Sequence, residues 1–296
     1  MILLCGGTGM LGERVAHRLA ESGREFRVLV RKTSDTSALR ALDAEMVVGD
    51  LRDPDSLAEA VRGAHTIIST ANSMARVLEG EKNLTIADVD VTGHADLIAA
   101  AEDAGVQRFV FLSFQGSILE SASPFANAKR ATETRLTASP IREVIVRPDM
   151  FQEVWLTPLV SFNWPERKFT IFGKGDSAHR YVAVDDVAAG VVGWALADNP
   201  PRLVEFGGPE GLTRNHAVDV FERALGTPVK RRHIPRPALA AGATLLQRIK
   251  PNLASVIGQS LFADRRPSRA DDAPLRALGV EPTPASAFIH RVVKSG

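Results

Sequence analysis

The sequence predicts an α/β protein in which a doubly wound parallel sheet is followed by a smaller C-terminal lobe. Three observations predict it. A glycine-rich loop joins an apolar run to a helical pattern within residues 1–20. Short apolar strands then alternate with helical patterns, and beyond residue 150 a looser pattern follows that prolines interrupt. Alternation of this kind gives parallel strands with helices on both faces of the sheet.

The predicted strands of the first half are apolar enough for a sheet that is buried on both sides. They are residues 1–5, 26–30, 45–49, 66–69, 107–112 and 143–146. Helical patterns lie between them at 13–20, 36–42, 55–62, 83–104 and 125–138. Ligands of such sheets bind beyond the carboxyl ends of the strands, near the point where the strand order reverses.

In the second half the elements are shorter. The sequence predicts a turn or hairpin at 173–176, strands at 180–184 and 203–206, helices at 186–197 and 214–225, and a mostly helical segment at 234–296. Asp185 and Thr213 are candidate N-caps of the two helices. We expect residues 1–150 to form the dinucleotide-binding domain and 151–296 the smaller substrate-binding lobe, with 180–200 returning to the first domain.

Composition excludes several classes of protein. Hydrophobic residues make up 45% of the 296, and the net charge is +1, so we expect no nucleic-acid or membrane-surface partner. Cys5 is the sole cysteine, and no Cys/His spacing indicates a metal site. We expect no signal peptide and no transmembrane span, and therefore a cytoplasmic protein with a small-molecule substrate, as a monomer or homodimer.

The glycine-rich loop is the strongest motif of the chain. It satisfies the spacing G-x-G-x-x-G through Gly7, Gly9 and Gly12, and G-x-x-G-x-x-G through Gly6, Gly9 and Gly12. Glycines let the backbone approach a pyrophosphate closely, and the following helix N-terminus offers unpaired N–H groups. The candidate cofactor-binding residues of this loop are Gly6, Gly7, Thr8, Gly9, Met10, Leu11 and Gly12.

The end of the second strand favours NADP(H) over NAD(H). An acid about 20 residues past the glycines would bind the ribose 2′-hydroxyl. Here Arg31 and Lys32 follow the strand instead, and two cations suit a 2′-phosphate. The alternative is a solvated strand end.

Two further strand ends are candidates for cofactor contacts. Asp50 could accept from the adenine amino group while Leu51 packs on the ring, although an aspartate in a turn is common. Ala71 and Asn72 follow the fourth strand, close to where the cofactor sugars should lie, and the alternative for them is an ordinary polar loop.

The chain resembles the atypical short-chain dehydrogenases/reductases, and within them the NmrA-like and isoflavone-reductase-like families. The resemblance rests on segments 6–12, 49–51, 111–113, 147–151 and 181–187 and on Lys129. It implies a Rossmann-type fold, an NAD(P)(H) site and a small C-terminal substrate lobe. It also implies that Pro148 and Met150, after the sixth strand, pass near the nicotinamide.

The same comparison exposes a departure from the family pattern. Short-chain dehydrogenases usually carry Tyr-x-x-x-Lys, whereas here Phe125 precedes Lys129 at that spacing. Phenylalanine has no exchangeable proton, and the sole tyrosine, Tyr181, has an aspartate four residues later. The resemblance leaves Ser113 and Lys129 as candidate catalytic residues, with Lys129 also contacting the cofactor. The alternative for Lys129 is a surface lysine paired with Glu133.

Three functions remain open. The protein is a reductase in which Lys129, Ser113 or water supplies the proton, a reductase of quinone-like acceptors that solvent can protonate, or a non-catalytic NADP(H)-binding regulator. Phe125, Phe151 and Trp155 are candidate substrate-binding residues, and the alternative for each is the core. For His179 a solvated or structural role is favoured.

Overall fold

The chain folds into two compact units, each made of three segments. The computed structural model describes residues 1–74, 76, 81, 84–121 and 123–295. Unit 1 comprises Met1–Ser113, Asn127–Arg147 and Val187–Val204. Unit 2 comprises Phe114–Ala126, Pro148–Asp186 and Glu205–Gly296.

Unit 1 is built on a seven-stranded sheet with the order β10-β6-β5-β4-β1-β2-β3. Every pairing from β6 to β3 is parallel. The strands are β1 Ile2–Cys5, β2 Phe26–Val30, β3 Glu45–Val48, β4 Thr66–Ser69, β5 Arg108–Leu112, β6 Arg142–Pro148 and β10 Leu203–Phe206. The strand order reverses between β1 and β4, which is where a doubly wound sheet binds its ligand.

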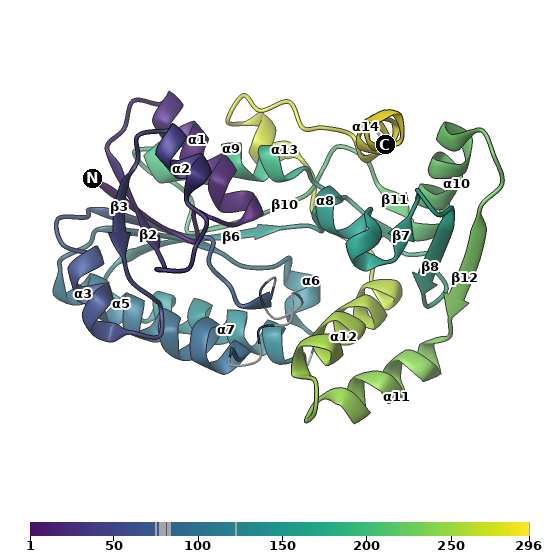
Figure 1. Ribbon diagram of the computed structural model, residues 1–296, viewed down its shortest axis with the longest axis horizontal. Coiled ribbons are helices and arrows are strands. Elements are labelled where there is room, and N and C mark those ends of the chain that lie inside the picture. The colour runs from purple at the N-terminus through teal and green to yellow at the C-terminus, as the bar shows by residue number, and fades with distance from the viewer. Residues whose placement is uncertain (75, 77–80, 82–83, 122, 296) are drawn as a thin grey trace. The chain divides into compact units, whose positions relative to one another are not determined.

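Helices cover both faces of this sheet. They are α1 Met10–Glu21, α2 Ser37–Ala41, α3 Pro54–Ala60, the π-helix η1 Ala87–Gly93, α5 His94–Asp103, α7 Pro124–Thr137 and α9 Val184–Leu196. In Figure 1, α1 and α9 lie on one face, and α3, α5 and α7 lie on the other. The core between the sheet and the second group is fully apolar at its centre, with Leu3, Ile67 and Phe109 at 0% exposure.

Unit 2 has short strands and most of the later helices. Its sheets have the orders β12-β8-β7 and β11-β9. The strands are β7 Phe162–Asn163, β8 Lys168–Phe172, β9 Ala178–His179, β11 Leu212–Thr213 and β12 Lys230–Ile234. The helices are α6 Gly116–Leu119, α8 Gln152–Trp155, η2 Pro158–Val160, α10 Arg214–Leu225, α11 Arg236–Leu246, α12 Pro251–Arg265, α13 Ala273–Arg276 and α14 Ala285–Ser295.

Aromatic packing forms the centre of unit 2. Phe162 meets Phe169 edge-on with ring centroids 5.3 Å apart, and Phe221 lies 5.2 Å from Phe169. The loop after β8 closes on Asp264, whose carboxylate accepts from the backbone N–H groups of Lys174 and Gly175. These contacts hold the loop between β8 and β9 against helix α12.

Most predicted elements of the first half are confirmed to within two residues, and most corrections concern the second half. The predicted strand at 180–184 is wrong, because this stretch makes only an isolated bridge between Val182 and Phe151. Helix α9 begins at Val184, so Asp185 lies in its first turn and not at its N-cap. Thr213 does cap α10, and its side chain accepts from the His216 N–H.

The predicted helix at 83–104 is observed as η1 followed by α5, and residue 83 lies outside the described residues. The predicted turn at 173–176 is a loop and not a hairpin, since β8 pairs with β7 and β12. Within the described residues, the helices are all too short or too polar to cross a bilayer.

Candidate functional site

Three glycines of the glycine-rich loop are required by the packing of the loop, independently of any ligand, because a Cβ atom on each would collide with neighbouring protein atoms. A Cβ atom on Gly12 would lie 1.9 Å from the carbonyl oxygen of Gly6, and one on Gly7 would lie 2.4 Å from Val28. Gly6 has a φ of +89°, and a Cβ there would lie 2.6 Å from the backbone nitrogen of Ala71. The loop therefore joins β1, β4 and α1 through backbone contacts that leave no space for a side chain.

Gly9 differs from these three glycines. Its φ is −93°, and the nearest atom to a Cβ there would be the Gly6 oxygen at 3.4 Å. It is exposed and stands at the N-cap of α1, where no side chain of the described residues makes the capping hydrogen bond. The first N–H groups of α1 consequently face an open surface, which is the arrangement that binds phosphate.

Charged residues gather near the end of β2. Burial and the positive charge of Arg76 lower the pKa of Arg31, whereas Glu81 and Asp50 act in the opposite sense. Arg76 forms an ion pair with Glu81 at 2.5 Å. Lys32 is exposed. Arg31 therefore has a second guanidinium in its vicinity, which the sequence did not predict.

Asp50 is engaged by protein groups. Its carboxylate pairs with Arg52 at 2.9 Å and also accepts from the Arg52 backbone N–H. Burial raises the pKa of Asp50, but the bonds to Arg52 outweigh it, so the pKa lies below its ordinary value. Leu51 is 7% exposed and belongs to the core of unit 1. Both residues therefore have structural roles that are independent of an adenine ring.

The residues after β4 line the glycine loop. Thr70 donates its hydroxyl to the carbonyl of Cys5 at 3.2 Å, and Ala71 is the close neighbour of Gly6. Asn72 accepts from the Met74 N–H through Oδ1, which fixes the turn. The structure therefore brings Ala71 and Asn72 to the strand-order reversal, as a cofactor site requires.

Lys129 is buried at the carboxyl end of β5 and is not a surface lysine. It is 3% exposed, and its ammonium donates to the Leu112 carbonyl at 2.9 Å and lies 4.7 Å from the Phe111 ring centroid. Burial lowers the pKa of Lys129, while the negative charges of Asp90 and Glu133 raise it. A buried cation of this kind gives up its proton more readily than an exposed one.

Asp90 is the main acidic neighbour of Lys129, and no motif in the sequence pointed to it. It is 1% exposed and accepts from the Ser73 N–H at 3.1 Å and from the Ser73 hydroxyl at 2.5 Å. Burial raises the pKa of Asp90, and the charge of Lys129 opposes that rise. Asp90 lies in the π-helix η1, a form that is often found at functional sites.

His94 completes the buried polar cluster. Its ring nitrogens contact the Ser69 hydroxyl at 3.0 Å and the Val89 carbonyl at 3.0 Å. Burial, together with the charge of Lys129, lowers the pKa of His94 to about 3. His94 is therefore neutral at physiological pH and cannot compete with Lys129 as a cation.

Ser113 follows the strand whose last carbonyl binds Lys129. Its backbone N–H donates to Val146 at 2.8 Å, which holds it against β6. Its hydroxyl oxygen is buried and has no hydrogen-bond partner among the described residues. A buried hydroxyl without a partner costs free energy, so this atom is suited to a ligand oxygen.

The remaining candidates belong to unit 2. Phe125 is 3% exposed and meets Phe114 edge-on at 5.0 Å. Pro148 ends β6, and Met150 is 4% exposed in the core. Phe151 is half-buried and precedes α8, whereas Trp155 lines a pocket together with Met150.

The donor groups of unit 1 fit a dinucleotide. Gly9 leaves room for a pyrophosphate at the N-terminus of α1, Arg31 provides a cation near the end of β2, and Ser113 offers a buried hydroxyl at the end of β5. No group of three metal-ligating side chains occurs among the described residues. The glycine loop, Arg31 and Ser113 are therefore the residues that would hold a dinucleotide at this edge of the sheet.

Comparison with known proteins decides the family. Residues 6–198 match the model of the NAD(P)H-binding family. The chain belongs to the NAD(P)H-binding family. This confirms the predicted resemblance and the predicted NAD(P)(H) cofactor class.

Relatives of this NAD(P)H-binding protein have different functions. It is 28% identical over 239 residues to the photosystem II assembly factor Ycf39 of Trieres chinensis. This match covers 79% of the chain and 72% of that protein. It is also 28% identical over 260 residues to a ceramide reductase of Caulobacter vibrioides. That match covers 77% of the chain and 80% of the reductase. The match spans only 44% and 58% of two further relatives.

Among solved structures, the fold matches the NADPH complex of an Escherichia coli NADPH-dependent quinone oxidoreductase. The TM-score is 0.77 with 19% identity, and the match covers 99% of both chains. This similarity confirms the predicted Rossmann-type doubly wound fold.

Gly9→Ala is expected to separate cofactor binding from stability. The added methyl group has space in the protein but occupies the surface where a pyrophosphate would approach. We expect the variant to unfold within about 0.5 kcal/mol of the wild type and to bind NADPH at least about tenfold more weakly. Calorimetric titration and denaturant unfolding measure the two quantities.

Gly12→Ala is the matched control, because its Cβ would collide with the Gly6 carbonyl. We expect its free energy of unfolding to fall by about 1–3 kcal/mol. A Gly9→Ala protein that binds NADPH like the wild type would contradict the placement of the pyrophosphate.

Proposed function

We propose that the protein is an NADPH-dependent reductase of a small, largely apolar carbonyl, enone or quinone-like acceptor. The observation that carries this proposal is the buried ammonium of Lys129 at the end of β5. It donates to the carbonyl of Leu112, the residue before Ser113. NADPH, when bound, supplies the hydride. The acceptor carbon takes up that hydride, and its oxygen then needs one proton.

Lys129 is the proposed source of this proton. Its lowered pKa brings the ammonium closer to the pH at which proton transfer is efficient, while the negative charges of Asp90 and Glu133 favour its charged form. Ser113 is proposed to hold the acceptor or ribose oxygen through its unpartnered hydroxyl. This division of roles replaces the tyrosine that Phe125 cannot supply.

Arg31 and Lys32 are proposed to select NADP(H). Arg31 lies in a group of charges with Arg76 and Arg52, so a 2′-phosphate would meet more than one guanidinium there. The negative charges of Asp50 and Glu81 are paired with Arg52 and Arg76. An excess of positive charge therefore remains for the phosphate.

A second candidate function is a cofactor-binding regulator or assembly protein without turnover. Two observations favour it. The chain matches an assembly factor over 79% of its length, and phenylalanine occupies the position of the usual catalytic tyrosine. Such a protein would bind NADPH through the same glycine loop and would not oxidise it.

The proposed activity is tested by following NADPH oxidation against quinones, aldehydes and enones. We expect turnover with at least one class, and Lys129→Met should lower it at least about a hundredfold, the usual contribution of a proton donor. Lys168→Met is the control, since Lys168 is exposed and pairs with Glu166. Tight NADPH binding without oxidation across the panel would favour the regulator.

Cofactor choice is tested with the double variant Arg31→Ala, Lys32→Ala. We expect NADPH binding to weaken about 10–100-fold, as for the loss of charged hydrogen bonds, with NADH binding nearly unchanged. Arg62→Ala serves as control, because Arg62 is exposed and pairs with Glu59 on α3. Equal losses for both nucleotides would refute the assignment of a 2′-phosphate site.

A further inference from the structure

A buried cation in unit 2 has no role in the proposed cofactor site. Arg214 is the first residue of α10 and is 8% exposed. Its guanidinium lies over the Phe162 ring at 4.3 Å and near the rings of Phe172 and Trp155, at 5.7 and 5.9 Å. One of its nitrogens, Nη2, donates to the Val160 carbonyl at 3.3 Å. Most of its donors are therefore enclosed by aromatic carbon.

The position of Arg214 in its helix gives no compensation for this burial. A cation in the first turn faces the positive end of the helix dipole, where negative charge is favoured. Asp264 is the acidic side chain that lines the same pocket, and it is already paired with Arg236 at 2.5 Å and accepts two backbone N–H groups. Burial lowers the pKa of Arg214, although its interaction with the neighbouring Tyr181 hydroxyl and the charge of Asp264 raise it.

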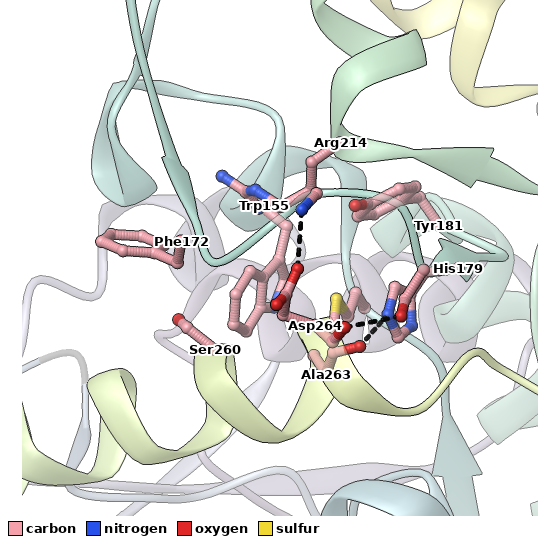
Figure 2. A pocket seen from close by; sticks show the side chains of 11 residues that line it. Trp155, Phe172, His179, Tyr181, Arg214, Ser260, Ala263 and Asp264 are labelled. Carbon is pink, nitrogen blue, oxygen red and sulfur yellow. Dashed lines mark hydrogen bonds between the residues drawn. The ribbon is translucent and has the colours of Figure 1, made fainter. Parts of the chain in front are cut away.

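Several polar atoms around Arg214 are buried without hydrogen-bond partners among the described residues. They are Nε and Nη1 of Arg214, the hydroxyl of Tyr181 and Nδ1 of His179. Figure 2 shows the Tyr181 hydroxyl pointing toward Arg214 across the pocket. Tyr181 is 0% exposed and His179 is 2% exposed, so water does not satisfy these groups from bulk solvent.

The unpartnered donors belong to Arg214 and Tyr181. The other ring nitrogen of His179, Nε2, lies 3.0 Å from the Ala263 carbonyl. Nδ1 of His179 lies 3.9 Å from the Asp149 carboxylate, so this side chain is directed to Ala263 and Asp149. The pocket thus presents two guanidinium N–H groups and one phenolic O–H to an acceptor atom.

The size and lining of the pocket limit what this acceptor can be. The free volume is about 10 Å³, which is room for roughly one water-sized group. The lining includes the apolar side chains of Met150, Trp155 and Phe172 together with Arg214 and Tyr181. A single oxygen atom fits, and a negative charge on it would offset the buried cation.

We propose that the pocket between Arg214 and Tyr181 binds one anionic oxygen, as in an organic carboxylate. Arg214 provides the charge and two N–H donors, and Tyr181 provides a hydroxyl donor. This site lies wholly within unit 2, and its assignment is independent of nucleotide binding and of turnover.

The test uses the full chain without nucleotide and benzoate as the probe. Trp155 lines the pocket, so benzoate should quench tryptophan fluorescence saturably and raise the midpoint of thermal unfolding. Benzamide, which has the same shape and no charge, should bind at least about tenfold more weakly. Formate binding without benzoate binding would support the anionic-oxygen site and show that it takes only a free small anion.

Variants locate the binding. Arg214→Met should abolish the benzoate response, and Tyr181→Phe should weaken it about tenfold while preserving the shape of the side chain. Arg276→Met, on an exposed arginine of unit 2 that pairs with Asp272, should behave like the wild type. If Arg214→Met does not fold, Arg214→Lys and Tyr181→Phe still test the site. Benzamide binding as tightly as benzoate, or no loss in the folded variants, would overturn the proposal.

Discussion

The burial of one ammonium group, that of Lys129, organises the candidate site of unit 1. A lysine at 3% exposure is tolerated only where its charge is matched, and here the Leu112 carbonyl, Asp90 and Glu133 match it. Asp90 in turn needs Ser73 to satisfy one of its oxygens, and His94 stays neutral beside the same charge. The ends of β4 and β5, the helix η1 and the start of α5 are therefore linked through a single cation.

Cofactor binding and cofactor use depend on different parts of this unit. The glycine loop is fixed by backbone contacts, and only Gly9 of its glycines is left free of close contacts that would exclude a side chain. That arrangement serves any dinucleotide-binding protein of the family. Reduction additionally needs a proton, and with phenylalanine at position 125 the proposed donor is Lys129, whose properties depend on Asp90. A reductase and a regulator would share the loop, and only the reductase would use Lys129 as a proton donor.

The fold could be predicted because its determinants are local: apolar strands, helical periodicity, the glycine spacing and the Thr213 cap are each read within a few residues. The strand predicted at 180–184 failed because an apolar run there packs into a core and finds only one bridging partner, at Phe151. Asp90, Arg76 and Arg214 could not be predicted, since their significance depends on burial and on neighbours distant in sequence. Gly173 shows the same limit, because its need for glycine comes from Asp264, far along the chain.

The pKa of Lys129, measured from the side-chain NMR resonances of isotopically labelled protein, is the most direct test of the candidate site. Burial should place this pKa below its usual value of 10.5, and Asp90→Asn should lower it further because a stabilising negative charge is lost. Glu102→Gln, which removes a half-buried carboxylate that pairs with Arg135, should leave it unchanged. A Lys129 pKa at or above the usual value, or one that Asp90→Asn does not move, would contradict the buried interaction of Lys129 with Asp90 on which the proposed site depends.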